Sequence, residues 1–434
     1  MTVHDVIVVG ARCAGAPTAM LLARRGHRVL LVDRATFPSD TMSTHLIKPA
    51  GVAHLKRWRL LGTVAGSGCP PITRFSSDAG DFRLAGSPTP LDGVAEAYAP
   101  RRTVLDKILV DAAAEAGAEV REGFAVDDLL ANGDRVVGIR GRGRGGPIVA
   151  ERARIVVGAD GRRSFVARAV GAPAYDARPP LTTTYYTYWA DVPTDGLESY
   201  SRDRRFSIAF PTHKGLTCTF HQWPRQEFHT VRADVEGSVL RALEALAPDL
   251  AGRVRGGRRA ERFVGTADLP SFFRRPYGPG WALVGDAGYH RDPHTAWGIT
   301  DAFRDAELVA EAIDDGLSER RPMGEALAEY ERQRNEAARP AYEATCRRAA
   351  FEPLSADEFR LRAALRDDPA ETSRYLGAAF GTVPIREFFA PENVKRIIAA
   401  VPRTRTDDPR DTHFPCSVAA GRPGPAARQH QGET

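Results

Sequence analysis

Three short apolar runs, far apart in the chain, each end at a glycine. An apolar run without polar alternation predicts a strand that is buried on both faces, as in a parallel sheet. Two of the runs also deliver an acid at the carboxyl end of the strand, Asp160 and Asp286. The runs are residues 6–9, 155–157 and 281–284, and the glycines are Gly10, Gly158 and Gly285.

The amino-terminal run opens a strand–turn–helix–strand pattern that is typical of dinucleotide binding. Gly10 and Gly15 fill the outer positions of a Gly-x-Gly-x-x-Gly turn, and the next strand ends on Asp33, 18 residues beyond Gly15. Such a turn lets the backbone and the helix amino end approach a diphosphate, and the acid accepts hydrogen bonds from ribose hydroxyls. Arg12 replaces the middle glycine. Its side chain either points outward or joins the phosphate contacts.

The run that ends at Gly285 leads through an Asp292-Pro293 turn into a helix. Apolar residues then recur at helical spacing, so a helix is predicted to begin within residues 296–300. Its free N–H groups and the positive end of its dipole would face whatever Asp286 binds, a favourable position for negative charge.

Two further segments border this region. Residues 101–117 predict a helix in which Thr103 and Asp106 form a capping box, with Arg102 either solvated or in contact with a cofactor. Residues 35–56 predict a loop and a short helix around His45, which is either a structural histidine or one on the substrate side.

Residues 172–275 are rich in β-branched and aromatic residues and predict an antiparallel sheet. Aromatic side chains on such a sheet usually form core, but their density here indicates that one face borders an apolar ligand cavity. Residues 62–100 either line the same cleft or cover the sheet, and helices are predicted at 323–350, 357–365 and 392–400 on the outside of the fold. The candidate substrate-binding residues are Tyr186, Tyr188, Phe220 and Trp223.

Composition narrows the function classes. The chain has 434 residues, 43% of them hydrophobic, which is enough for two to three domains with substantial cores. The net charge of +5 comes from dispersed arginines, which argues against nucleic acid as a partner. The five cysteines show no metal-binding spacing, so we expect neither a metal site nor disulfides. No apolar run approaches the roughly 20 residues of a membrane span, and we expect a cytoplasmic protein.

Taken in this order, the amino-terminal glycine turn, the 158–161 strand end and the segment from Gly285 to Gly298 identify a resemblance. The chain resembles the group A flavin monooxygenases, the class of para-hydroxybenzoate hydroxylase, over roughly residues 3–350. The resemblance implies FAD as cofactor, NADPH or NADH as electron donor and dioxygen as co-substrate. The FAD-binding residues that it implies are Gly10, Arg12, Cys13, Ala14, Gly15, Asp33, Arg34, Arg102, Asp160, Gly161, Gly285, Asp286, Pro293, Gly298 and Ile299.

The sequence departs from the family at several positions. Trp297 stands before Gly298, where it would narrow the space over the flavin and shape the substrate side. Ala167 separates Val166 from Arg168, which leaves the role of that arginine open. His290 and His294 flank the Asp-Pro turn and either orient a ligand or are plain loop residues.

What the resemblance implies chemically is the transfer of oxygen from a flavin C4a-hydroperoxide to an apolar or aromatic small molecule, by hydroxylation or epoxidation, as in secondary metabolism. No side chain is predicted as a catalytic acid or base. A geranylgeranyl-reductase-like enzyme that saturates alkenes and a non-catalytic FAD-fold protein stay open as alternatives. A flavin halogenase is disfavoured because no two tryptophans stand two residues apart.

The predicted fold is α/β, with a Rossmann-like FAD-binding domain, an inserted mainly antiparallel substrate domain and carboxyl-terminal helices. The chain could form a homodimer. The predicted divisions are 1–171 with a cleft-lining insertion at 62–100, 172–275, 276–350, 351–402 and a disordered tail at 403–434.

Overall fold

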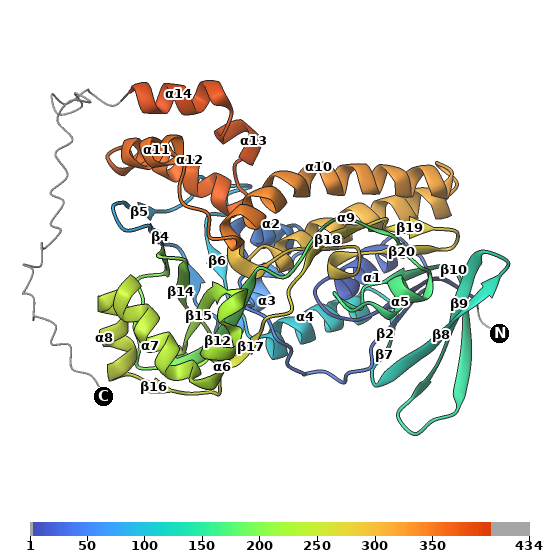
Figure 1. Cartoon of the computed structure of the whole chain (residues 1–434). Coiled ribbons are helices and arrows are strands. Elements are labelled where there is room, and N and C mark those ends of the chain that lie inside the picture. Colours follow the sequence, from blue (N-terminus) through green and yellow to red (C-terminus); the bar gives the residue numbers. More distant parts are fainter. Residues whose placement is uncertain (1–2, 401–434) are drawn as a thin grey trace, which may run out of the picture.

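The computed structural model describes residues 3–400, so the predicted tail at 403–434 lies outside the described residues. The chain forms two large sheets, and helices cover them (Figure 1). The mixed α/β architecture that the sequence predicts is confirmed.

The first sheet holds the three apolar runs as adjacent parallel strands. Its order is β19 (Tyr277–Gly278), β20 (Trp281–Leu283), β10 (Ile148–Gly158), β1 (Val3–Val9), β2 (Val29–Val32) and β7 (Glu119–Arg121). Val9 pairs with Gly158, and Gly158 pairs with Leu283. This register brings the carboxyl ends of β1, β10 and β20 to the same edge of the sheet.

The hairpin of β8 (Phe124–Asn132) and β9 (Arg135–Gly143) extends the first sheet through antiparallel pairing with β10 and projects from the body (Figure 1). The apolar patterns of the sequence do not reveal β8. The strand β8 carries three acidic or amide residues among its nine and is only partly buried, so it lacks the apolar signal of a core strand.

The second sheet contains the aromatic segments. Its order is β16 (Arg258–Arg259), β12 (Thr182–Ala190), β15 (Thr217–Pro224), β14 (Arg205–Pro211), β13 (Leu197–Arg202), β4 (Phe75–Asp78) and β5 (Arg83–Gly86), and β17 (Val264–Thr266) also pairs with β12. All pairings are antiparallel except that of β13 with β4. Two strands of the 62–100 segment therefore belong to this sheet.

Alternation along the strands separates the aromatic residues onto two faces. Tyr186 and Phe220 lie on the face toward the carboxyl-terminal helices. Tyr185 and Trp223 lie on the other face, which α7 (Val235–Leu246) and α8 (Pro248–Gly256) cover. The helices α7 and α8 are separate because Pro248 begins the second one.

The carboxyl-terminal region consists of α9 (Gly298–Leu317), α10 (Met323–Ala349), α11 (Ala356–Arg366), α12 (Pro369–Phe380), α13 (Ile385–Phe388) and α14 (Pro391–Ala399). The predicted helix start within 296–300 is correct. The prediction that the later helices lie outside the fold is wrong for α11, because Leu365 is buried in one cluster with Phe75 and Tyr186. Leu376 of α12 belongs to the same cluster. The segment of α12 escaped prediction altogether.

Further α-helices and strands complete the fold. They are α1 (Gly15–Ala23), α2 (Pro49–Arg57), α3 (Leu61–Gly66), β3 (Pro71–Ile72), β6 (Ala97–Tyr98), α4 (Arg102–Glu115), α5 (Phe165–Ala169), β11 (Ala174–Arg178), α6 (Phe228–Ala233), β18 (Ser271–Arg274) and β21 (Tyr289–His290). Helix α1 packs against both α4 and α9 on the first sheet, and the buried apolar residues of the three helices form its core.

Candidate functional site

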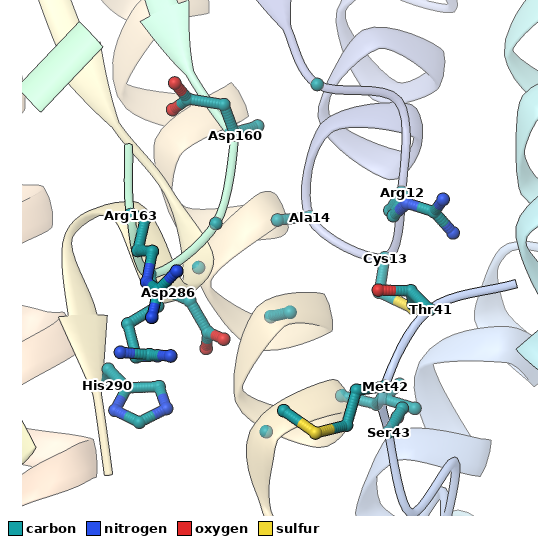
Figure 2. Close-up of a pocket in the computed structure, with 18 of the residues that line it drawn as sticks. Arg12, Cys13, Ala14, Thr41, Met42, Ser43, Asp160, Arg163, Asp286 and His290 are labelled. Atoms are coloured by element: carbon teal, nitrogen blue, oxygen red, sulfur yellow. The ribbon is translucent and has the colours of Figure 1, made fainter. Parts of the chain in front are cut away.

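One cavity of about 1090 Å³ joins the three strand ends to the aromatic sheet. Gly10, Asp160 and Asp286, which come from three distant parts of the chain, all line it. Figure 2 shows Asp160, Asp286 and the 12–14 loop around the same space. Every residue that the sequence named for the cofactor lines this cavity except Gly15, which lies behind the glycine turn.

Gly10 and Gly15 allow the close approach of the β1–α1 turn to the end of β10. Gly10 has a φ of +102°, and a Cβ on it would lie 2.5 Å from the carbonyl oxygen of Ala159. A Cβ on Gly15 would lie 1.7 Å from the carbonyl oxygen of Gly10. The two glycines are therefore required by the fold as well as by ligand approach.

The Asp33 carboxylate organises the glycine turn. Its Oδ2 accepts a hydrogen bond from the N–H of Ala11 at 2.7 Å, and its Oδ1 accepts one from the N–H of Ala35 at 2.8 Å. Each carboxylate oxygen has a further lone pair, so Asp33 can still accept from a ligand hydroxyl. Asp33 and Arg34 both line the cavity.

Arg12 links the β1–α1 turn to the buried Asp106 of α4 and to the segment around Ser39. Its Nη1 donates to Asp106 Oδ2 at 2.5 Å and its Nη2 to Ser39 Oγ at 2.9 Å. In Figure 2 its guanidinium points away from Asp160 and Asp286. Of the two alternatives for Arg12, the structure thus has the outward orientation.

Asp106 is the central acceptor of this cluster and was misassigned from the sequence. The predicted capping box of Thr103 and Asp106 is wrong, because α4 has Arg101 as its N-cap without a side-chain cap. Asp106 is fully buried and accepts two hydrogen bonds of 3.0 Å from Arg102, in addition to the one from Arg12. The buried cations compete for this carboxylate more strongly than a backbone N–H does.

Cys13 also donates to Asp106, with 3.5 Å between Sγ and Oδ1. Burial raises the pKa of the Cys13 thiol to about 12, so this cavity residue is a neutral thiol rather than a nucleophile.

Asp160 caps the helix that follows it. It accepts from the hydroxyl of Ser164 at 2.5 Å and from the N–H groups of Phe165 and Val166 at 2.6 and 3.2 Å. The neighbouring Gly161 has a φ of +79° and open space where a Cβ would be. Arg168 lines the cavity and donates to the backbone carbonyl of Arg163.

The segment from Gly285 to Ile299 forms the wall opposite the glycine turn. A Cβ on Gly285 would lie 2.7 Å from that of Ala14, which fixes how closely the two walls meet. Gly298 begins α9, is exposed, and has no atom within 4 Å of an added Cβ. The first N–H groups of a 20-residue helix therefore face open cavity.

Half of the predicted substrate residues line the cavity. Tyr186 and Phe220 do, whereas Tyr188 and Trp223 do not. Trp223 lies on the opposite face of the sheet, against α7 and α8. Tyr188 faces the correct side, but its hydroxyl is 2.8 Å from His45 Nε2 and the Arg101 guanidinium covers its ring at 3.8 Å.

The sequence does not reveal the other residues that line the cavity near Tyr186 and Phe220. Met42, Ser43, Thr44 and Leu46 come from the loop before α2, and Thr184, Thr266 and Leu269 come from the sheet and its return strand. Small polar and apolar residues in a loop carry no periodic signal, and only their packing against Tyr186 and Phe220 reveals them.

His45 is structural. It is buried, its Nδ1 lies 3.0 Å from the Ala99 carbonyl oxygen, and burial lowers its pKa to about 3. It does not line the cavity. Its φ of +42° turns the loop that carries Met42 and Ser43.

The two histidines of the Asp-Pro turn differ. His290 lines the cavity, beside Asp286 in Figure 2, and His294 stacks on Phe206 with ring centroids 4.2 Å apart. Burial lowers the pKa of His294 to about 3, so it is a neutral core residue.

Trp297 does not narrow the cavity, contrary to the prediction. Its ring lines a second cavity of about 420 Å³ between α2, α9, α10 and α13. A Cβ on Gly381 would lie 2.7 Å from this ring, and the Lys48 ammonium lies 4.0 Å from its centroid. Lys48 also donates to the carbonyl oxygen of Ala379 at 2.7 Å, near the end of α12. These contacts hold Trp297 away from the main cavity.

The sequence matches the FAD binding domain family over residues 3–245, which is more than half of the chain. The chain belongs to this family. Its members and relatives are FAD-dependent oxidoreductases, so the protein is a flavoenzyme, and the non-catalytic alternative no longer applies.

Two kinds of relative have similar sequences. Digeranylgeranylglycerophospholipid reductase 1 of Methanopyrus kandleri is 28% identical, and the match covers 81% of this chain and 90% of that protein. The 6-methylpretetramide 4-monooxygenase of Streptomyces rimosus is 26% identical over 73% of this chain and 76% of that protein. The flavoenzyme is thus similar to both a reductase and a monooxygenase.

Solved structures share the fold. The myxobacterial chondrochloren halogenase CndH has a TM-score of 0.74 and 24% identity, covering 93% of this chain and 99% of that chain. PqsL of Pseudomonas aeruginosa has a TM-score of 0.68 and 23% identity, covering 88% and 100%. At this identity the likeness concerns the fold. Within residues 3–400, the flavoenzyme has no helix that is both long and apolar enough to span a bilayer.

Proposed function

We propose that the protein is a monooxygenase that uses FAD, NAD(P)H and dioxygen to hydroxylate or epoxidise an apolar or aromatic small molecule. The observation that carries the proposal is the continuity of one cavity from the three strand ends to Tyr186 and Phe220. A substrate on the aromatic wall would lie against the cofactor within the same cavity. The sequence similarity to a monooxygenase supports the same reaction class.

The residues of the cavity fit FAD. The close contacts of Gly10 and Gly15 leave the backbone at the start of α1 free of side chains, where the diphosphate would lie. Asp33 would accept from the adenosine ribose, Asp286 would face the ribityl chain, and Gly298 and Ile299 would lie beside the pyrimidine ring. Bound FAD would supply the hydride-accepting and oxygen-activating chemistry that the side chains lack.

The tasks of the polypeptide are then electrostatic and steric. The N–H groups at the start of α9 favour negative charge on the adjacent ligand atoms. Tyr186 and Phe220 hold an apolar ligand, and the loop with Met42 and Ser43 covers it. The thiol of Cys13 and the imidazoles of His45 and His294 stay neutral, so none of them is assigned a proton transfer.

A second candidate function is the reduction of an alkene. Several similar sequences are digeranylgeranylglycerophospholipid reductases, which makes this the main alternative. The aromatic wall favours a compact ring system over long isoprenoid chains.

The decisive experiment uses the purified holoenzyme with ¹⁸O₂, NADH or NADPH, and a panel of polycyclic aromatic and isoprenoid compounds. A monooxygenase consumes oxygen in a substrate-dependent way and places one ¹⁸O atom in the product. A reductase instead gives a product that is heavier by two hydrogens, without oxygen. If only externally reduced FAD supports turnover, the NAD(P)H part of the proposal is wrong while the oxygenation part stands.

A further inference from the structure

Four buried polar atoms without a partner gather at the α9 end of the main cavity. They are Nε and Nη1 of Arg291, the hydroxyl of Tyr289 and Oδ2 of Asp305. All three residues line the cavity, and the Arg291 side chain is only 3% exposed. Buried polar groups in folded proteins almost always have a hydrogen-bond partner. Three donor atoms and one carboxylate oxygen without a partner therefore indicate a place where a ligand supplies one.

The charges around this place do not balance. Asp301 accepts from Arg291 at 2.5 Å and from Arg304 at 2.9 Å, and Asp305 accepts from Arg304 at 2.7 Å. Arg334 of α10 also faces Asp305, and among the described residues it has no carboxylate partner, because its contacts are carbonyl, hydroxyl and amide oxygens. Three arginines, of which Arg291 and Arg334 are buried and Arg304 is partly buried, therefore share two carboxylates.

The groups that face Asp305 carry more positive than negative charge. They are Arg304 and Asp301 on its own helix, and Arg334 and Tyr330 on α10. Burial raises the pKa of Asp305, which favours its uncharged form. A buried excess of positive charge is costly unless an anion compensates it.

Arg291 is the member of the cluster that can meet such an anion. Arg304 lines the second cavity and not the main one, and Arg334 lines neither. Asp301 lines both, so it forms the partition between the two cavities. Among these three arginines, only Arg291 combines buried, unused N–H groups with a place on the main cavity.

We propose that Arg291 binds an anionic oxygen or nitrogen of a ligand at the α9 end of the main cavity. The proposal rests on the proposed function, because it assigns the ligand to the same FAD and substrate site. Two sources have the required chemistry. One is the ionised pyrimidine edge of reduced FAD, and the other is a carboxylate or phenolate of the substrate.

The first arm of the test measures the reduction potential of the bound FAD under anaerobic conditions. If FAD is the source, Arg291→Gln weakens the preference for reduced over oxidised FAD about tenfold, which lowers the two-electron potential by about 30 mV. Arg304→Gln is the matched control, because it removes one charge from the same cluster without touching the main cavity.

The second arm titrates the oxidised holoenzyme with 2-naphthoate and with 2-naphthamide and follows the flavin absorbance. If the substrate is the source, Arg291→Gln weakens binding of the acid about tenfold and leaves binding of the amide unchanged. Arg291→Lys, which keeps the charge but not the planar donor set, weakens binding of the acid about threefold. This second variant keeps the test available if glutamine at position 291 prevents folding.

The two arms give results that support or overturn the proposal. A response of Arg291→Gln in either arm, at least threefold larger than that of Arg304→Gln, supports the proposal and identifies the source. Equal responses of the two variants, or no response in either arm, overturn it. Neither arm needs turnover, so a failure of the monooxygenase proposal appears only in the ¹⁸O₂ assay.

Discussion

Arg12 Nη1 and Asp106 Oδ2 lie 2.5 Å apart, although 94 residues separate them in the chain. The pair connects the β1–α1 turn to α4, and Arg12 also reaches Ser39, so three segments around the cavity share one anchor. A side chain that interrupts the glycine pattern in the sequence thus stabilises the turn from outside.

Asp106→Asn should therefore destabilise the cofactor side of the fold. It leaves Arg12 and Arg102 without their counter-charge, and removing one partner of a buried ion pair costs about 3–5 kcal/mol. Chemical denaturation of the apoprotein measures this loss, and the FAD content of the purified variant should fall as well. Asp111→Asn on the same helix is the control, since Asp111 is half exposed and pairs only with Lys107. Equal stability of the two variants would contradict the central role of Asp106.

Gly10→Ala should abolish FAD retention. The new methyl group would lie 2.5 Å from a backbone oxygen that cannot move without displacing β10. Gly26→Ala has a similarly positive φ of +88° but open space around it, so it should cost only about 1–2 kcal/mol and keep its flavin. The absorbance ratio of flavin to protein after purification distinguishes the two. A yellow Gly10→Ala protein would show that the turn tolerates a wider spacing.

His45 should make stability depend on pH below neutrality. Its pKa is about 3 in the folded protein and 6.5 in the unfolded chain, so the unfolded chain binds the extra proton first as pH falls. The stabilisation is complete above pH 6.5 and is lost as pH falls below it, by about 2 kcal/mol between pH 6.5 and pH 5. The unfolding free energies of the native protein and of His45→Asn should be measured at both ends of that interval. The native protein should lose about 2 kcal/mol more than the variant as the pH falls. Asparagine suits the positive φ, so the turn is retained. Parallel pH profiles would refute a buried neutral imidazole.

Phe220 and Trp223 offer a test of the two faces of β15. Both side chains are almost fully buried, so Phe220→Leu and Trp223→Leu should each destabilise the protein. The loss should be smaller than for truncation to alanine, which typically costs about 3–5 kcal/mol. Only Phe220→Leu enlarges the main cavity and should change the range of compounds that perturb the flavin spectrum. An altered ligand range in Trp223→Leu would place the substrate on the other face of the sheet.

The parallel sheet and its edge could be predicted from the sequence because the strands are short, apolar and followed by glycine. The register of Val9, Gly158 and Leu283 then brings the predicted acids together. The substrate wall was harder, since Tyr186 and Tyr188 have the same strand periodicity. Only the tertiary contact of Tyr188 with His45 and Arg101 excludes it from the cavity.

The missed features share a physical cause. Thr103 and Asp106 fit a local capping pattern, but a long-range pair with Arg12 takes the carboxylate. Trp297 precedes a predicted flavin contact, yet its ring packs against Gly381 instead. Gly381 follows α12, a helix that the periodicity of the sequence did not reveal. Local patterns identify which residues can interact, whereas distant partners decide which interaction forms.

The aromatic face of the second sheet is covered by α12, which follows it by about 150 residues in the chain. During synthesis Tyr186 and Phe220 are therefore made long before their cover exists, and they stay open to solvent until residues 369–380 have left the ribosome. Contacts of such large sequence separation form slowly. We expect nascent chains that stop before α12 to be prone to aggregation and to depend on chaperones. Truncating the protein before this helix should therefore lower the yield of soluble protein.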